Sequence, residues 1–361
     1  MAASRRIGRM AKRSLASMWA KSFERNLTAW TREGLRQGSK QMGRAVTATT
    51  KAAAAKRKPP PGPGDWLPGV AMGLHGMLRF RLYRPPGIGF GERLPLMVML
   101  HGCGQDANGF AVSTRMNRLA ARERFLVLYP EQDRVANPQG CWNWFDTRNG
   151  RAYSEAALIL KTIDQVCLFY PADASRVAVS GLSAGASMAA LLATRYPMRF
   201  KAVVMHSGVP PGAADSTASA MRAMHGRRAL PALSAAHALP PLMLIHGEHD
   251  SVVSSRNAQL SASLWAEAAG AQASEPRHVQ RGQRHGMTIT DYKRRGQPVS
   301  RLVEVASLGH AWSGGAPSKP YSDSRGPDAS KMAWSFAASQ FSHEPAAEAA
   351  AVTRGWPSRA A

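Results

Sequence analysis

The chain has 361 residues, 44% of them apolar, which is enough for one large domain with a buried core and an appendage. Its 47 Lys and Arg outnumber its 23 Asp and Glu, giving a net charge of +24. Three cysteines exclude a scaffold built from disulfides, and no apolar run approaches the roughly 18 residues that a membrane-spanning helix needs.

The N-terminal part of the chain is basic and differs from the rest. Residues 1–58 hold 15 Lys and Arg but only two acidic residues. Between residues 10 and 36, apolar side chains recur every three or four positions and basic side chains lie mostly on the other face, which is typical of a basic amphipathic helix. These apolar side chains are Leu15, Trp19, Phe23, Leu27 and Trp30. Residues 51–64 follow as a basic, proline-rich linker that we expect to be extended or disordered, so 1–64 forms a basic arm.

Two interpretations of this arm stay open. Its amphipathic helix either packs on its own domain or attaches residues 1–58 to an anionic surface, such as a membrane, a polymer granule or nucleic acid. The arm starts with basic residues but no apolar segment follows them, so we recognise no standard secretory signal. This favours a cytoplasmic location.

From about Trp66, short apolar strands alternate with segments of helical periodicity. Strands are predicted at 76–85, 94–100, 125–130, 176–180, 202–208 and 241–247, with a strand pair at 288–306. Helices are predicted at 109–123, 154–169, 183–196, 254–269 and 328–341. Continuously apolar strands joined by helices predict an α/β fold, with a mostly parallel central sheet and helices on both faces. We place this domain at residues 65–342, with a cap-like insertion at 209–240 and a disordered tail at 343–361.

The peptide Gly181-Leu-Ser-Ala-Gly185 places a serine between two glycines, directly after a predicted strand. Alone, this G-x-S-x-G pattern is weak evidence, because a chain of this length contains it at random about once in ten cases. The strand before it and the small residues around it are what a strand-to-helix elbow needs to expose a nucleophile. We therefore predict that Ser183 is a catalytic nucleophile rather than a turn serine.

A nucleophilic serine needs an acid and a base further along the chain. Asp250 lies just past the predicted strand at 241–247, and His310 lies in a glycine-flanked loop after the predicted strand pair. We predict that they complete a triad, although Asp250 could instead cap the next helix and His310 could be a surface histidine. Weaker candidates are His206, His246 and His249 for the base and Asp291, Asp323 and Asp328 for the acid.

The oxyanion of an acyl-transfer reaction needs backbone N–H donors. The loop LHGCGQD, residues 100–106, follows the central strand, and we pair the N–H of Cys103 with that of Ala184. His101 in this loop could equally be a structural hydrogen-bonding residue, so we do not assign it to catalysis. The histidines and cysteines show no metal-ligand spacing, and neither a metal nor a cofactor is expected.

Together these motifs resemble the type 1 catalytic domain of the poly(3-hydroxybutyrate) depolymerase esterases, which adopt the α/β-hydrolase fold. The similar stretches are residues 100–111, 125–145, 176–197, 244–253 and 309–330. The resemblance implies Ser183, Asp250 and His310 as the triad. It also implies Cys103 and Ala184 as the oxyanion donors.

The resemblance further implies that the segment CWNWF, residues 141–145, lies near the substrate groove. Candidate substrate-binding residues are Trp142, Trp144 and Trp312. From composition alone, Trp142 and Trp144 would rather be core residues. The family also suggests a disulfide between Cys103 and Cys141, whereas an unbridged pair would fit a cytosolic location better, and the sequence leaves this choice open.

The sequence thus predicts a serine esterase that cleaves 3-hydroxybutyrate ester bonds through an acyl-enzyme. A feruloyl or acetyl-xylan type carbohydrate esterase is the alternative, because related catalytic domains share these residues. A non-catalytic protein that binds granules or nucleic acid is a further alternative, but it would leave the triad unused. Secreted members of the family generally carry a signal peptide and a polymer-binding domain, neither of which is recognised here. We expect a cytoplasmic, granule-associated protein, with an extracellular one as the alternative.

Overall fold

The computed structural model describes residues 60–227, 238–317 and 319–342. Nearly all of the predicted basic arm, part of the predicted cap-like insertion and the predicted tail lie outside the described residues. The first described strand begins at Asp65 and the last described helix ends at Phe341.

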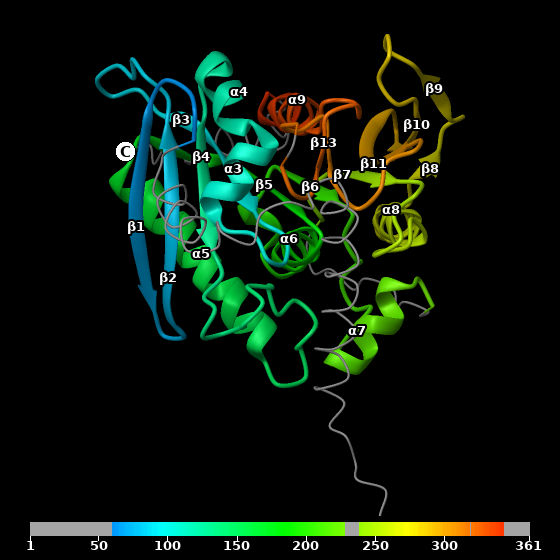
Figure 1. The fold of residues 1–361 in the computed structure, drawn as a ribbon, viewed down its shortest axis with the longest axis horizontal. Coiled ribbons are helices and arrows are strands. Elements are labelled where there is room, and N and C mark those ends of the chain that lie inside the picture. Colours follow the sequence, from blue (N-terminus) through cyan, green and yellow to red (C-terminus); the bar gives the residue numbers. More distant parts are fainter. Residues whose placement is uncertain (1–59, 228–237, 318, 343–361) are drawn as a thin grey trace, which may run out of the picture. The chain divides into compact units, whose positions relative to one another are not determined.

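Eleven described strands form one sheet in the order β1-β2-β4-β3-β5-β6-β7-β11-β10-β8, with β9 paired to β10 (Figure 1). Their bounds are β1 Asp65–Gly73, β2 Gly76–Arg84, β3 Leu94–Leu100, β4 Leu126–Glu131, β5 Ala172–Leu182, β6 Ala202–His206, β7 Leu242–Gly247, β8 Gln272–Ala273, β9 Arg277–Val279, β10 Met287–Arg294 and β11 Gln297–Val305. The six central strands from β4 to β11 are parallel, and the strands at both edges are antiparallel. The predicted mostly parallel sheet is confirmed.

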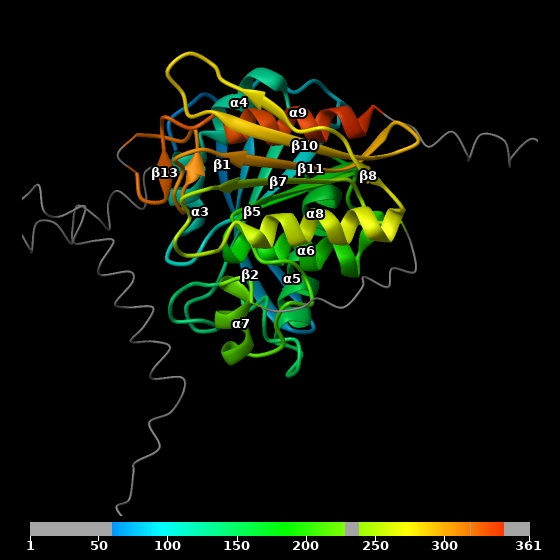
Figure 2. The same cartoon turned by 90° about the vertical axis from the view of Figure 1, so that its right-hand side faces the viewer.

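Helices cover both faces of this sheet (Figure 2). Their bounds are α3 Ala107–Thr114, α4 Met116–Glu123, α5 Arg151–Phe169, α6 Ala184–Arg195, α7 Thr217–Met224, α8 Arg256–Ala269 and α9 Ala329–Phe341. Buried side chains of α5, α6 and α8 share one core cluster, and those of α3, α4 and α9 share the other. The fold is that of the α/β hydrolases, as the sequence predicts.

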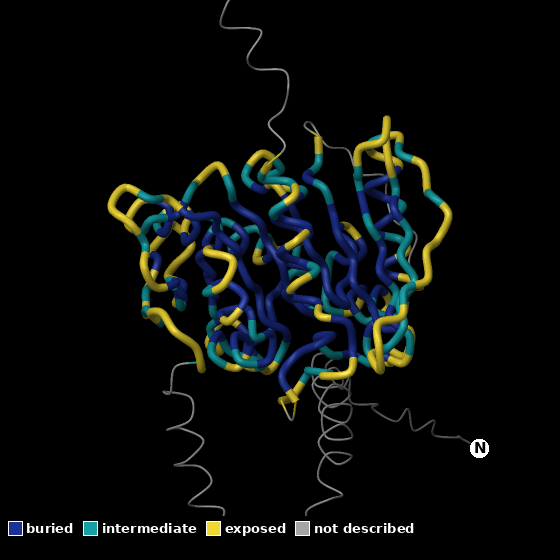
Figure 3. The backbone as a smooth tube through the Cα atoms, turned by 90° about the horizontal axis from the view of Figure 1, so that it is seen from above, coloured by how far each residue is buried: buried dark blue, intermediate teal, exposed yellow. Residues whose placement is uncertain are grey.

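The central strand β3 shows why its sequence is apolar at every position. All seven residues of LPLMVML are buried. Leu96 and Val98 belong to the core on one face, whereas Met97 and Met99 belong to the core on the other. Because a strand alternates its side chains between two faces, a strand covered on both sides needs apolar residues throughout. Figure 3 shows these buried segments running through the centre, with exposed residues in the surrounding loops.

Two local features differ from the sequence prediction. The strand β1 was not predicted, because only Ala71 among its nine residues is buried and no apolar run marks it. It pairs with β2 at the edge of the sheet, where Pro68 is tolerated since an edge strand needs fewer backbone donors. The helix predicted at 109–123 is two helices, because Arg115 takes a left-handed conformation with φ 57° between α3 and α4.

Candidate active site

The predicted triad residues follow strands that are close neighbours in the sheet. Ser183 follows β5, Asp250 follows β7 and His310 follows β11, and the sheet order here is β5-β6-β7-β11. These strands are parallel, so their carboxyl ends all lie at the same end of the sheet. The topology therefore brings the three loops together, as an α/β hydrolase requires.

Ser183 sits on a strained turn between β5 and α6. Its φ of 57° and ψ of −119° are unusual for a residue with a side chain, and its N–H donates to the carbonyl oxygen of His206 at 2.9 Å. A Cβ at Gly181 would overlap the backbone of Gly185, and a Cβ at Gly185 would overlap the carbonyl group of Leu100. Both glycines of the motif are thus required by close backbone approach, and the turn is the predicted elbow.

This packing gives a first prediction. Gly185→Ala should lower the free energy of unfolding by about 1–3 kcal/mol, because the new methyl group must displace the backbone of β3. Urea denaturation measures the loss. Gly89→Ala is the matched control, since a Cβ there would have only Glu92 within 4 Å, at 3.6 Å, and should change stability by less than about 0.5 kcal/mol. Equal midpoints for the Gly185 variant and the wild type would contradict the account of the elbow.

Asp250 and His310 are joined directly. His310 Nδ1 lies 2.7 Å from Asp250 Oδ2, while Asp250 Oδ1 accepts hydrogen bonds from the N–H groups of Val252 (2.9 Å) and Val253 (2.8 Å). The Asp250 side chain is fully buried. Burial alone would raise the pKa of Asp250, but hydrogen bonds from His246 and His310 outweigh it and hold this pKa well below its usual range. Asp250 is therefore an ionised, fixed partner for the His310 ring.

The weaker candidates for acid and base are occupied elsewhere. Asp291 pairs with Arg277 and Arg301, Asp323 lies 3.3 Å from His285, and Asp328 caps α9. His249 is exposed, whereas His206 and His246 are buried beneath the candidate site. Among the side chains of these candidates, that of His246 contacts the carboxylate of Asp250, with its Nε2 3.4 Å from Asp250 Oδ2 and 2.8 Å from the Val253 carbonyl oxygen.

The two predicted oxyanion donors lie on loops that pack together. Among the described residues, neither the N–H of Cys103 nor that of Ala184 has a hydrogen-bond acceptor. A Cβ at Gly102 would lie 3.4 Å from the carbonyl oxygen of Leu182, which places the loop of Cys103 beside the elbow. Two uncommitted N–H groups on neighbouring loops are what an oxyanion site needs.

His101 holds the loop of Cys103 in place. Its Nε2 accepts the N–H of Gln132 at 3.1 Å, so Nδ1 carries the proton and donates to the Gly102 carbonyl oxygen at 2.9 Å. Its own carbonyl oxygen accepts the indole N–H of Trp142 at 3.1 Å. The ring is buried and both of its nitrogens are hydrogen-bonded to the backbone, so His101 has a structural role.

Cys103 and Cys141 form a disulfide, with their Cα atoms 4.2 Å apart. It ties the loop of the candidate oxyanion donor to the tryptophan-bearing segment 141–145. Cys167 is a buried free thiol on α5. The choice that the sequence leaves open is thus resolved in favour of the bridge.

The bridge gives a second prediction. Replacing Cys103 and Cys141 together by Ala should lower the free energy of unfolding by about 2–4 kcal/mol, because the disulfide closes a loop with a sequence separation of 38 residues. Dithiothreitol should destabilise the wild type and leave the double variant unchanged in urea denaturation. Cys167→Ala, which keeps the bridge, is the control and should remain sensitive to the reductant. A wild type that is insensitive to complete reduction would contradict this prediction.

Two of the three tryptophans that are predicted to bind substrate expose no side-chain surface that a substrate could contact. Trp142 and Trp312 are each 0% exposed, and their indole N–H groups point to His101 and Ser330. They are core residues that support the site, and their assignment as substrate-binding residues is corrected. Trp144 is half-buried and lies edge-to-face with Phe145 at 5.6 Å, so it stays a candidate.

A buried carboxyl group that the sequence does not predict lies beneath the tryptophan segment. Glu155 on α5 accepts the backbone N–H of Asn143 at 2.8 Å, and Asn143 Oδ1 accepts the amide of Asn137 at 2.9 Å. Burial raises the pKa of Glu155, although hydrogen bonds from Asn143 oppose this. The available signal was the helical spacing that places Glu155 on the same face as the apolar Ala152 and Ile159.

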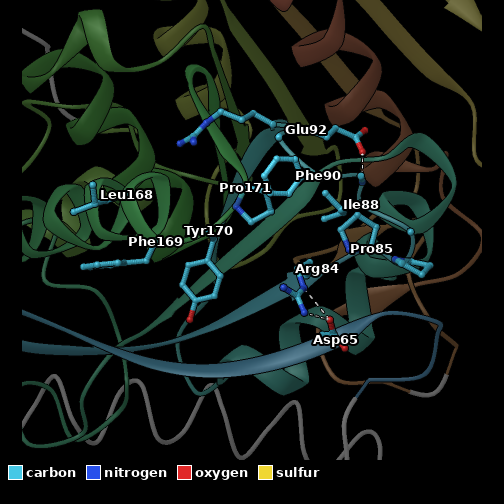
Figure 4. A pocket seen from close by; sticks show the side chains of 15 residues that line it. Asp65, Arg84, Pro85, Ile88, Phe90, Glu92, Leu168, Phe169, Tyr170 and Pro171 are labelled. Atoms are coloured by element: carbon cyan, nitrogen blue, oxygen red, sulfur yellow. Dashed lines mark hydrogen bonds and ion pairs between the residues drawn. The ribbon is translucent and has the colours of Figure 1, made fainter.

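A groove of about 620 Å³ lies at the amino ends of β3 and β5 (Figure 4). Residues 85–93 and 168–171 line it, with an ion pair between Asp65 and Arg84 and an exposed Phe90 at its edge. These segments precede β3 and β5, whereas the candidate triad follows the carboxyl ends of its strands. The groove therefore does not belong to the candidate active site.

The sequence pattern of the family described as "Esterase PHB depolymerase" matches residues 78–280, more than half of the chain. This match contains Ser183, Asp250, Cys103 and Ala184. The chain belongs to the esterase PHB depolymerase family. Its α/β-hydrolase domain is accordingly a carboxylic ester hydrolase domain.

The chain is similar to proteins that are named for different esters. The chain is 36% identical to poly(3-hydroxyalkanoate) depolymerase C of Paucimonas lemoignei, over 38% of this chain and 33% of that protein. It is 27% identical to acetylxylan esterase A of Emericella nidulans, over 54% of this chain and 72% of the relative. It is 33% identical to feruloyl esterase B of Neurospora crassa, over 35% and 42%. The matched region thus spans only about a third of the Paucimonas depolymerase.

A solved structure supports the fold assignment. The acetyl xylan esterase from Aspergillus awamori superposes with a TM-score of 0.54 at 21% identity, covering 68% of this chain and 94% of that one. Within the part of the chain that the structure describes, no helix is both long enough and apolar enough to cross a membrane. The same described residues contain no cluster of three or more His, Cys, Asp or Glu that could hold a metal ion.

Proposed function

We propose that this protein is a serine ester hydrolase that works through an acyl-enzyme, with Ser183, Asp250 and His310 as its triad. The observation that carries the proposal is the 2.7 Å contact between buried Asp250 and His310, at the sheet edge where Ser183 occupies a strained elbow. A serine with an oriented histidine and an ionised aspartate is the arrangement that activates a hydroxyl group at neutral pH.

The first half of the reaction forms the acyl-enzyme. His310 Nε2 takes the proton of Ser183 Oγ, since Nδ1 is bonded to Asp250. The serine oxygen attacks the ester carbonyl carbon, and the N–H groups of Cys103 and Ala184 stabilise the resulting oxyanion. The bond to the alcohol oxygen then breaks, and His310 gives this oxygen the proton.

The second half releases the acid. Water loses a proton to His310 and attacks the acyl carbonyl, and the same two N–H groups hold the new oxyanion. When this intermediate collapses, Ser183 Oγ leaves and recovers the proton from His310. Asp250 stays ionised throughout and stabilises the imidazolium form of the ring.

For the substrate, we propose esters of 3-hydroxybutyrate, from which a second hydroxyacyl unit leaves as the alcohol. The family match and the 36% identity to the Paucimonas depolymerase support this choice. The alternative is acetylated xylan, supported by the match over 72% of the Emericella acetylxylan esterase. Half-buried Trp144 suits either a polyester or a carbohydrate ester.

Product release by the purified full-length chain tests both parts of this proposal. The substrates are 3-hydroxybutyrate oligomers, methyl ferulate and acetylated xylan, and Ser183→Ala serves as the blank. We expect the oligomers to be cleaved fastest, giving monomer and short oligomers. Faster release of ferulate or acetate would keep the triad and overturn the substrate. Equal rates for the wild type and the blank would overturn the proposed hydrolase.

A further inference from the structure

A buried histidine lies between the strands that carry the nucleophile and the acid. His206 ends β6, the strand between β5 and β7, and its side chain is 0% exposed. It touches no solvent and the proposed reaction does not use it. A buried imidazole is costly unless its nitrogens have hydrogen-bond partners, so its contacts show what it does there.

The contacts of His206 reach two parts of the candidate site. Its carbonyl oxygen accepts the N–H of Ser183 at 2.9 Å. Its ring Nε2 accepts the N–H of Ser313, three residues after His310, at 3.1 Å. Because Nε2 is an acceptor, the proton sits on Nδ1, which lies 3.2 Å from the hydroxyl oxygen of Ser207.

Ring packing fixes the imidazole in this orientation. The ring stacks on Trp312, with centroids 5.1 Å apart and an interplanar angle of 26°. Trp312 is itself held by a hydrogen bond of 3.1 Å from its indole N–H to the Ser330 hydroxyl. The His310 loop is therefore anchored to His206 by a hydrogen bond at Ser313 and by the stacked ring of Trp312.

We propose that His206 is a positioning residue that sets the distance between Ser183 and His310, by holding the elbow through its main chain and the His310 loop through its ring. This inference rests on the proposed triad. It assigns His206 no proton transfer, because both ring nitrogens are committed and the ring is buried. A misplacement of about 1 Å between reacting groups can lower the rate about 10²-fold. Fixing their distance can therefore offset the free-energy cost of burying a polar side chain.

The clamp requires a neutral ring. Only an unprotonated Nε2 can accept the N–H of Ser313. Burial and the neighbouring His246 and His310 lower the pKa of His206 to about 3, although Asp250 opposes this. The His206 ring is thus neutral at physiological pH, and it adds no positive charge that would oppose protonation of His310 during the reaction.

A matched pair of polar variants tests the clamp. In His206→Gln, the amide oxygen can take the place of Nε2 and accept the N–H of Ser313. In His206→Asn, the shorter side chain reaches only the position of Nδ1. We expect kcat to fall about 10²-fold in the Asn variant with KM within about threefold, and the Gln variant to recover most of kcat.

Two further readouts separate positioning from a general loss of stability. Tyr129→Phe removes a buried 2.7 Å hydrogen bond to Asn117 on the β4 side of the fold, and should lower Tm with kcat unchanged. The downfield proton resonance of His310 Nδ1–H should shift in His206→Asn and return in His206→Gln. Wild-type kcat in the Asn variant, or equal loss in both variants, would overturn the inference.

Ser207→Gly covers the case in which the Asn variant does not fold. It keeps the ring but removes the hydroxyl that holds the proton on Nδ1, and it suits the φ of 54° at this position. We expect a several-fold lower kcat at unchanged KM, and an unchanged kcat would overturn the clamp. Full activity in Ser183→Ala would instead mean that the proposed triad is wrong, so the two failures are distinguishable.

Discussion

Ser183→Ala is expected to lower kcat by about 10⁶-fold on any ester that the wild type cleaves, with the fold intact. In the proposed mechanism, the hydroxyl oxygen of Ser183 is the protein atom that attacks the ester carbonyl carbon and holds the acyl group, so no neighbour can replace it. The substitution removes only the hydroxyl group. Ser183 is the N-cap residue of α6, but its side chain makes no capping hydrogen bond, so the helix loses none. Steady-state kinetics and a thermal melt of the same preparation check both statements.

The chain offers a close control for this variant. Ser180 lies three residues earlier on β5 and is 0% exposed, and its hydroxyl oxygen has no hydrogen-bond partner among the described residues. Ser180→Ala removes a buried hydroxyl of the same kind and should leave kcat and Tm nearly unchanged, because no bond is lost. Residual activity in Ser183→Ala within 10-fold of the control would rule out Ser183 as the nucleophile.

The meeting of the three candidate triad residues could be predicted from the sequence, because each follows a strand that the sequence marks. Residues 177–179 before Ser183 and 242–245 before Asp250 are continuously apolar and buried, as segments of strands covered on both faces must be. Parallel strands bring their carboxyl ends to one edge, so three loops distant in sequence had to meet there. Topology thus predicts that the loops of Asp250 and His310 lie close together, and the structure places the two side chains 2.7 Å apart.

The supporting residues could not be predicted in the same way. Trp142 lies in a loop and Trp312 in a strand of only two residues, so no periodicity tells a buried ring from an exposed one. Their burial depends on His101 and His206, which pack against them. The disulfide depends on the meeting of two loops that are separated by 38 residues. The role of His206 likewise depends on Ser313, more than a hundred residues away, coming within 3.1 Å of its ring.

Asp250→Asn is expected to lower kcat by about 10⁴-fold without removing the fold. The Asn amide oxygen can still accept the N–H groups of Val252 and Val253, which keeps the turn after β7. The amide nitrogen would then face His310 Nδ1 as a donor, so the ring would hold its proton on Nε2 and could not take one from Ser183. Asp164→Asn is the control, because it removes an exposed carboxylate near the C-terminal end of α5 that pairs with Arg199.

The same variant should also change how stability depends on pH. The pKa of Asp250 is lowered in the folded protein, so its ionised form contributes stability that is present above the ordinary aspartate pKa of about 4 and is lost as pH falls below it. Asn has no such dependence. The free energies of unfolding of the wild type and of Asp250→Asn should therefore approach each other as the pH falls from about 5 to about 2 in urea titrations. A gap that stays constant with pH would mean that Asp250 is not held ionised by His246 and His310, and that the acid of this site is another group.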